Sequence, residues 1–234
     1  MLETAQLENL VKATLERFGR IDILVNNAGG MIPRPSLALS ERAFEKIVRF
    51  NLTSPFLMTK LVVPHMVKIA GSGAIVNISS VTGRIGAIAQ APYVASKWAL
   101  EGLSEELALE VAPFGIRVVI VEPGITKSAI FAKNVDLPPT VGVYDAHYRR
   151  MLQFYAAGIP QATDPMEVAE VVYEAVTADA PKFRYTVSWG GDGIVEGRSR
   201  MTDEEWVTLG DTTDDGEYYR RFEAAFGLAI APTS

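Results

Sequence analysis

Residues 74–80 read Ala-Ile-Val-Asn-Ile-Ser-Ser, and residues 116–124 read Ile-Arg-Val-Val-Ile-Val-Glu-Pro-Gly. Each is a short apolar run that stops at turn residues, as is typical of a strand buried on both faces of a parallel sheet. Between the two runs, Pro92 fits the first turn of a helix that continues to about residue 112. Because parallel strands need a long crossover connection, this pattern predicts a strand–helix–strand unit of a parallel α/β sheet.

The same pattern extends in both directions along the chain. Residues 4–18 carry apolar side chains at helical spacing, and residues 21–25 form another apolar run. Residues 185–189 form a fourth candidate strand. Further helices are expected at residues 41–70, from Pro165, from about residue 203, and at 215–226. The sequence therefore predicts an α/β fold, a three-layer Rossmann-like parallel sheet with helices on both faces, in a single domain over residues 1–234.

The composition excludes several classes of protein. The chain has 234 residues, a net charge of −6, no cysteine and two histidines, His65 and His147. Lys and Arg are scattered, without the basic patch of a nucleic-acid-binding protein. The absence of cysteine excludes disulfides, and two isolated histidines argue against a zinc site, so no metal is expected. Neither a signal peptide nor a membrane span is recognisable, so the expected location is the cytoplasm.

Tyr93 and Lys97 are the first candidate catalytic pair. Residues four apart on a helix lie on one face. A free tyrosine has a pKa of about 10, and a neighbouring cation lowers that value by favouring the phenolate. Lowering the pKa of the tyrosine to about 7 would require about 4 kcal/mol of differential interaction between its charged and neutral forms. The alternative is a surface tyrosine beside a solvated lysine, and this motif alone does not decide between them.

Three further segments place polar groups where a parallel sheet binds its ligands. Ser80 directly follows a strand, so its hydroxyl could stabilise charge on a substrate carbonyl, or it is an ordinary turn residue. Asn51 falls on the apolar face of its helix and needs partners there; it is either functional or a buried residue at a helix kink. Residues 26–29, Asn-Asn-Ala-Gly, allow close approach of the backbone to a ligand, or form a plain turn.

Taken together, these motifs resemble those of the classical short-chain dehydrogenase/reductase (SDR) family. Their order is Asn26-Asn-Ala-Gly29, Asn51, Asn77-Ile-Ser-Ser80, Tyr93-x-x-Ser-Lys97 and Pro123-Gly124. They span about residues 20–130, and the strand at 185–189 looks like the last strand of the family. The resemblance implies an oxidoreductase that uses NAD or NADP to interconvert a secondary alcohol and a ketone by hydride transfer.

The resemblance also implies roles for individual residues. Tyr93 would be the general acid/base, and Lys97 would bind the nicotinamide ribose and lower the pKa of Tyr93. Ser80 would orient the substrate oxygen, and Asn51 would hold a water that continues a proton relay from Lys97. The implied cofactor contacts are Asn26, Ala28, Gly29, Tyr93, Lys97, Pro123, Gly124, Thr126 and Ser128.

The start of the chain departs from the family pattern. Members normally open with a strand and a Gly-rich turn that holds the pyrophosphate, within a strand order of 3-2-1-4-5-6-7. This sequence resembles an N-terminally truncated member that retains family strands four to seven, and its other glycines lack the dinucleotide-binding context. The strand at 21–25 would then be a sheet edge, and dinucleotide binding would be weak. The alternative function is therefore a non-catalytic remnant that serves as a binding or scaffold protein.

The remaining expectations concern the substrate and assembly. Residues 125–160 correspond to the family's substrate lid, followed by a C-terminal extension at 196–234. The lid is rich in apolar and aromatic residues, which suits a bulky apolar alcohol or ketone as small-molecule partner, or ordinary core packing. The segment 121–124 and the extension look most like steroid- or retinoid-type members. A homodimer or homotetramer is expected by analogy with the family.

Overall fold

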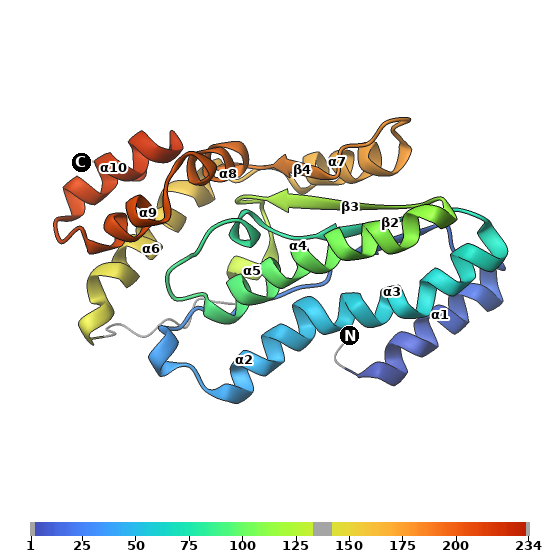
Figure 1. Cartoon of the computed structure of the whole chain (residues 1–234). Helices are drawn as coiled ribbons and strands as arrows, with labels where there is room; N and C mark the ends of the chain where they lie inside the picture. The colour runs from blue at the N-terminus through green and yellow to red at the C-terminus, as the bar shows by residue number, and fades with distance from the viewer. Residues whose placement is uncertain (1–2, 133–141, 233–234) are drawn as a thin grey trace.

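The computed structural model describes residues 3–132 and 142–232. Its centre is a four-stranded, fully parallel sheet in the order β1-β2-β3-β4 (Figure 1). The strands are β1 (Ile23–Asn26), β2 (Gly73–Ile78), β3 (Ile116–Pro123) and β4 (Arg184–Val187). The predicted α/β, Rossmann-like fold is therefore confirmed.

Helices cover both faces of this sheet. On one face, residues of α1, α3 and α4 form a core cluster with Ile75 of β2; on the other face, α7 packs against Val76 of the same strand. Figure 1 shows α7 on the opposite side of β3 from α3 and α4. These helices are α1 (Thr4–Phe18), α3 (Ser54–His65), α4 (Ala91–Val111) and α7 (Pro165–Thr177). Two covered faces explain why β2 and β3 are apolar at consecutive positions rather than alternate ones.

A third apolar cluster lies beyond the carboxyl ends of the strands. There α6 packs with the C-terminal helices α8, α9 and α10, which gather at one end of the molecule in Figure 1. The helices are α6 (Asp145–Gly158), α8 (Gly191–Arg200), α9 (Asp203–Asp211) and α10 (Asp215–Phe226). The predicted lid at 125–160 thus supplies α5 (Ala129–Ala132) and α6, whereas its residues 133–141 lie outside the described part of the chain.

Local sequence signals set the starts of several helices. The Ser40 side chain accepts the Ala43 N–H at the start of α2 (Glu41–Val48). Asp164 accepts the Met166 N–H at the start of α7. A capping box formed by Thr202 and Glu205 starts α9, where a helix was expected from about residue 203. Each such cap satisfies N–H groups that have no partner inside the helix.

Two of the expected boundaries differ from the structure. The helices predicted for residues 41–70 are interrupted by π-helical turns, η2 (Arg49–Thr53) and η3 (Met66–Ala70). The last strand ends at Val187 rather than residue 189, because Ser188 has a positive φ of 74° and Trp189 bridges antiparallel to Ile125. Short 3₁₀ turns join other elements: η1 (Ser36–Ala38), η4 (Val81–Gly83), η5 (Ala112–Phe114), η6 (Gly142–Tyr144) and η7 (Ile159–Gln161).

Strand β1 is an edge strand, as expected for residues 21–25. Within the described residues it pairs with β2 alone, and the side chains of Ile23 and Val25 are 50% and 42% exposed. Among the helices at 3–132 and 142–232, none is long and apolar enough to cross a membrane.

Candidate active site

A cavity of about 830 Å³ opens at the carboxyl ends of β1, β2 and β3. Loops that leave these strands line it together with the first turns of α4, which is where an open parallel sheet binds ligands. Nine of the residues predicted for catalysis or cofactor binding contribute to its wall: Ala28, Gly29, Ser80, Tyr93, Lys97, Pro123, Gly124, Thr126 and Ser128. The topology therefore brings together groups up to 100 residues apart in sequence.

Tyr93 and Ser80 meet inside this cavity. The side chain of Ser80 hydrogen-bonds the phenol of Tyr93. The Ser80 hydroxyl also accepts the Thr82 N–H at 3.2 Å and lies 3.5 Å from the Pro123 carbonyl, so it is held between β2 and β3. Burial raises the pKa of Tyr93, and the hydrogen bond with Ser80 opposes that shift only in part. Desolvation of the phenol is the larger of these two effects, so the pKa of Tyr93 lies above its usual value, and the lowering expected from Lys97 stays a prediction.

Lys97 is a buried cation one helical turn beyond Tyr93. Its Nζ donates to the Ile78 carbonyl at 2.6 Å and lies 5.7 Å from the centroid of the Tyr93 ring. Burial lowers the pKa of Lys97 to about 8, although the charge of Glu101 opposes the shift. An ammonium has three N–H donors, and Ile78 is its one hydrogen-bonded acceptor among residues 3–132 and 142–232. Lys97 therefore keeps donors for a ligand in the cavity.

Asn51 lies behind the cavity wall, in the π-helical turn η2, and is 1% exposed. Its Oδ1 accepts the Gly30 N–H at 2.9 Å, and its Nδ2 donates to the Gly30 carbonyl at 2.9 Å and to Ser96 Oγ at 3.0 Å. A Cβ at Gly29 would lie 3.3 Å from Asn51 Oδ1 and 3.7 Å from Lys97 Nζ. Asn51 thus shapes the loop after β1 against Lys97, while its expected role in holding a water stays a prediction.

An Asn51→Ala variant should be less stable than the wild type by about 2 to 3 kcal/mol, because it leaves the N–H and C=O of Gly30 without their partners. Urea unfolding at equilibrium measures the difference. The control is Asn27→Ala, which removes an exposed amide from the same loop and should change stability by less than about 0.5 kcal/mol. Equal unfolding midpoints for the two variants would contradict the positioning role.

Asn26 is the predicted cofactor contact that the structure does not bring to the cavity wall. It is still part of β1, opposite Asn77 of β2, and its amide donates to Asn77 Oδ1 at 2.8 Å. Asn77 in turn donates to Ser104 Oγ of α4 at 2.8 Å. Asn26 therefore belongs to a buried polar chain beneath the site, because the strand extends one residue further than the apolar run suggested. Its contact with the cofactor stays a prediction.

Sequence reasoning missed Gln90 and did not connect it with Tyr155. Gln90 Nε2 donates to Tyr155 Oη at 2.8 Å, and both residues line the cavity. Burial raises the pKa of Tyr155, and the neighbouring Tyr93 phenol contributes in the same direction, which places the two phenols close together. The sequence signal that could have pointed to Tyr155 was the aromatic character of the segment that forms α6.

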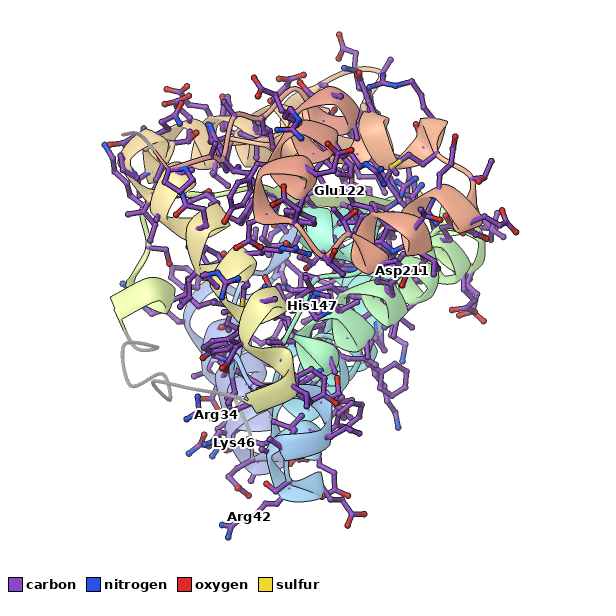
Figure 2. The ribbon with its side chains drawn as sticks, turned by 90° about the vertical axis from the view of Figure 1, so that its left-hand side faces the viewer. Arg34, Arg42, Lys46, Glu122, His147 and Asp211 are labelled. Carbon is purple, nitrogen blue, oxygen red and sulfur yellow. The ribbon has the colours of Figure 1, made fainter. Side chains whose placement is uncertain are left out.

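A second cavity of about 390 Å³ adjoins the first and lies among α6, α9 and α10. Figure 2 looks onto this end of the molecule, where His147 marks α6 and Asp211 marks the end of α9. The two cavities share five wall residues: Val81, Thr82, Gln90, Phe154 and Tyr155. Apart from Arg150, the described residues around the second cavity are uncharged and mostly apolar. It therefore extends the polar site near Tyr93 into an apolar compartment.

A family model for short chain dehydrogenases matches residues 1–137. The chain belongs to the short-chain dehydrogenase family. The match starts at residue 1, and the predicted lack of a Gly-rich segment stays a prediction.

Three known proteins illustrate the similarity. The uncharacterized oxidoreductase YusZ of Bacillus subtilis is 35% identical over 182 residues, covering 74% of this chain and 63% of YusZ. Human 17-beta-hydroxysteroid dehydrogenase type 1 is 37% identical over 196 residues, which cover 79% of this chain and 60% of the human protein. A solved short-chain dehydrogenase from Streptomyces avermitilis superposes with a TM-score of 0.73 at 30% identity, covering 90% of this chain and 78% of its own. The chain thus spans less than two thirds of the length of both curated relatives.

Proposed function

We propose that the protein is an NAD(P)-dependent oxidoreductase that interconverts a secondary alcohol and a ketone, with Tyr93 as general acid/base. The observation that carries this proposal is the convergence of Ser80, Tyr93 and Lys97 on one cavity. A scaffold protein has no need of a buried lysine beside a buried phenol, an arrangement that costs stability. The enzyme is therefore favoured over the binding-protein alternative.

The residues present fit a nicotinamide dinucleotide. Gly29 approaches Lys97 without an intervening side chain, since a Cβ there would lie 3.7 Å from Lys97 Nζ, and Lys97 has donors for ribose hydroxyls. When bound, the dinucleotide supplies or accepts the hydride. The residues that would hold it are Ala28, Gly29, Lys97, Pro123, Gly124, Thr126 and Ser128. The cavity is large enough for a substantial part of such a ligand. The relative affinities for NADH and NADPH distinguish an NAD-dependent from an NADP-dependent enzyme.

The chain's own residues divide the proton chemistry between them. Because burial raises its pKa, Tyr93 carries its proton at neutral pH, as is needed to protonate the oxygen of a ketone during reduction. Ser80, held by Thr82 and Pro123, hydrogen-bonds the same substrate oxygen and stabilises the charge that develops there. In the oxidation direction, the nearby Lys97 ammonium stabilises the phenolate that must accept the proton.

We expect NADH or NADPH, in large excess, to raise the thermal unfolding temperature and to be oxidised in the presence of a ketone. A ligand present at 100 times its Kd stabilises the folded state by about 2.7 kcal/mol, so even weak binding is detectable. The assay follows nicotinamide absorbance with a panel of aliphatic, cyclic and steroid ketones. Failure of both dinucleotides to bind or to be oxidised would favour the binding-protein alternative.

A further inference from the structure

Arg150 of α6 is a buried arginine in the wall of the apolar second cavity. Its side chain is 1% exposed, and it is the one charged residue among the described residues around this cavity. Arginine is almost never fully buried unless it is paired and hydrogen-bonded. The partners of Arg150 therefore indicate whether it only stabilises the fold or can also bind a ligand.

The partners of Arg150 satisfy only part of its guanidinium. Nε donates to Asp215 Oδ1 at 2.8 Å, and the guanidinium carbon lies 4.5 Å from the centroid of the Tyr218 ring. Nη1 and Nη2 are both buried, and neither has a hydrogen-bond partner within residues 3–132 and 142–232. Buried polar groups are nearly always hydrogen-bonded, so two unsatisfied donors on one cation require an explanation.

The nearby acidic groups do not occupy the free donors of Arg150. Asp215 accepts hydrogen bonds from both Arg149 and Arg150, and Asp145 also lies close enough to Arg149 to interact with its charge. Tyr218 does not supply the missing negative charge, because burial raises its pKa to about 12 and keeps the phenol neutral. Arg150 is thus the one cation in a mostly apolar wall, and two of its buried nitrogens lack hydrogen-bond partners among the described residues. This combination suits a monoanion better than a doubly charged phosphate.

The position of Arg150 relative to Tyr93 completes the argument. The second cavity shares Thr82, Gln90 and Tyr155 with the first, and Tyr155 lies next to Tyr93. A molecule that reacts at Tyr93 can therefore extend along apolar side chains such as Met151 and Phe222 toward Arg150.

We propose that Arg150 binds the carboxylate of the substrate, which is an oxo or hydroxy carboxylic acid with an apolar stretch between its two oxygen-bearing ends. This inference rests on the proposed function and refines its substrate class. Nη1 and Nη2 of the guanidinium would donate paired hydrogen bonds to the two oxygens of the carboxylate, and the apolar walls would exclude water from them. The expected substrate is thus an amphipathic acid rather than a wholly apolar ketone.

The kinetic test compares acids with their methyl esters. The substrates are straight-chain carboxylic acids of six, eight and ten carbons that carry a ketone at the penultimate carbon. We expect the wild type to prefer the best acid over its methyl ester by about 10- to 100-fold in kcat/KM, as for a hydrogen bond to a charged group. Arg150→Met should lower kcat/KM for the acid by a similar factor and change that for the ester by less than about threefold.

Arg149→Met is the matched control, because Arg149 also pairs with Asp215 but is 58% exposed and does not line the cavity. It should leave the preference for acids unchanged. Arg150→Lys keeps the charge without the paired donors and should retain part of the preference, which provides a second test if the methionine variant fails to fold. Circular dichroism checks the fold of each variant.

A binding experiment separates this inference from the proposed function. Calorimetry and the fluorescence of Trp206, which lines the cavity, report the binding of 4-phenylbutanoate and of 4-phenylbutanamide. We expect the acid to bind the wild type at least about tenfold more tightly than the amide, and to lose that advantage in Arg150→Met. If the protein oxidises NADH or NADPH but binds and reduces acids and neutral analogues equally well, the inference is overturned and the proposed function stands. Acid binding that depends on Arg150, without any ketone reduction, would support the anion site and overturn the proposed function.

Discussion

Tyr93→Phe is expected to lower kcat by about 10²- to 10⁴-fold, the range in which a positioned general acid or base contributes. The variant removes the proton that the substrate oxygen needs and keeps the ring that packs beside Lys97. Dinucleotide binding should change little, because the proposed cofactor contacts of Lys97 and of the loop after β1 remain. Steady-state kinetics on the best ketone, with binding measured separately, gives both quantities.

The matched control is Tyr155→Phe. Tyr155 is a second buried phenol on the same cavity, hydrogen-bonded by Gln90. Because Tyr155 is not proposed to transfer the proton, its loss should affect KM more than kcat and by no more than about tenfold. A Tyr155→Phe variant that lost as much kcat as Tyr93→Phe would show that the proton donor had been assigned to the wrong phenol.

Lys97→Met is expected to unfold at a higher denaturant concentration than the wild type at pH 7, although it should be inactive. The pKa of Lys97 is lowered from 10.5 to about 8 by burial, and a shift of this size corresponds to about 3 kcal/mol that the charged lysine costs the folded state. Below pH 8 the folded protein bears this cost in full. Because the unfolded chain binds the extra proton between pH 8 and 10.5, the stability of the wild type rises through that window.

The stability advantage of Lys97→Met should therefore shrink as the pH rises from about 8 to 10.5. Urea unfolding at several pH values measures it. Lys12→Met replaces a largely exposed lysine of α1. Its free energy of unfolding should differ from that of the wild type by no more than about 0.5 kcal/mol at any of these pH values. A Lys97→Met variant that is less stable than the wild type at pH 7 would show that the buried lysine does not destabilise the folded protein.

Much of this fold and site could be predicted from the sequence, because the informative residues stand at positions with simple geometry. Ser80 directly follows a buried run, and Tyr93 and Lys97 are four apart on a helix, so local periodicity places all three at one end of a parallel sheet. The caps at Ser40, Asp164 and Thr202 are equally local.

What could not be predicted depends on contacts between distant segments. The pKa of Tyr93 is set by how deeply α4 is buried, which no short motif encodes. Arg150 and Asp215 are 65 residues apart, and only the packing of α6 against α10 makes one the partner of the other. Asn26 was assigned to the cofactor by its place in the motif that resembles the family, whereas its pairing with Asn77 is decided by the register of β1 against β2.

The buried chain Asn26–Asn77–Ser104 has a consequence for how the strands find one another. Strand β2 is covered on both faces, and β1 is apolar from Ile23 to Val25, so a β1 strand displaced by one residue would still bring hydrocarbon side chains against the core. In such a misaligned sheet, however, the amides of Asn26 and Asn77 would lie in the interior without each other, and that loss of hydrogen bonding is costly. This amide pair therefore favours the observed alignment of β1 and β2 over alignments shifted by one residue. As a result, the edge of the sheet below the cavity adopts one structure.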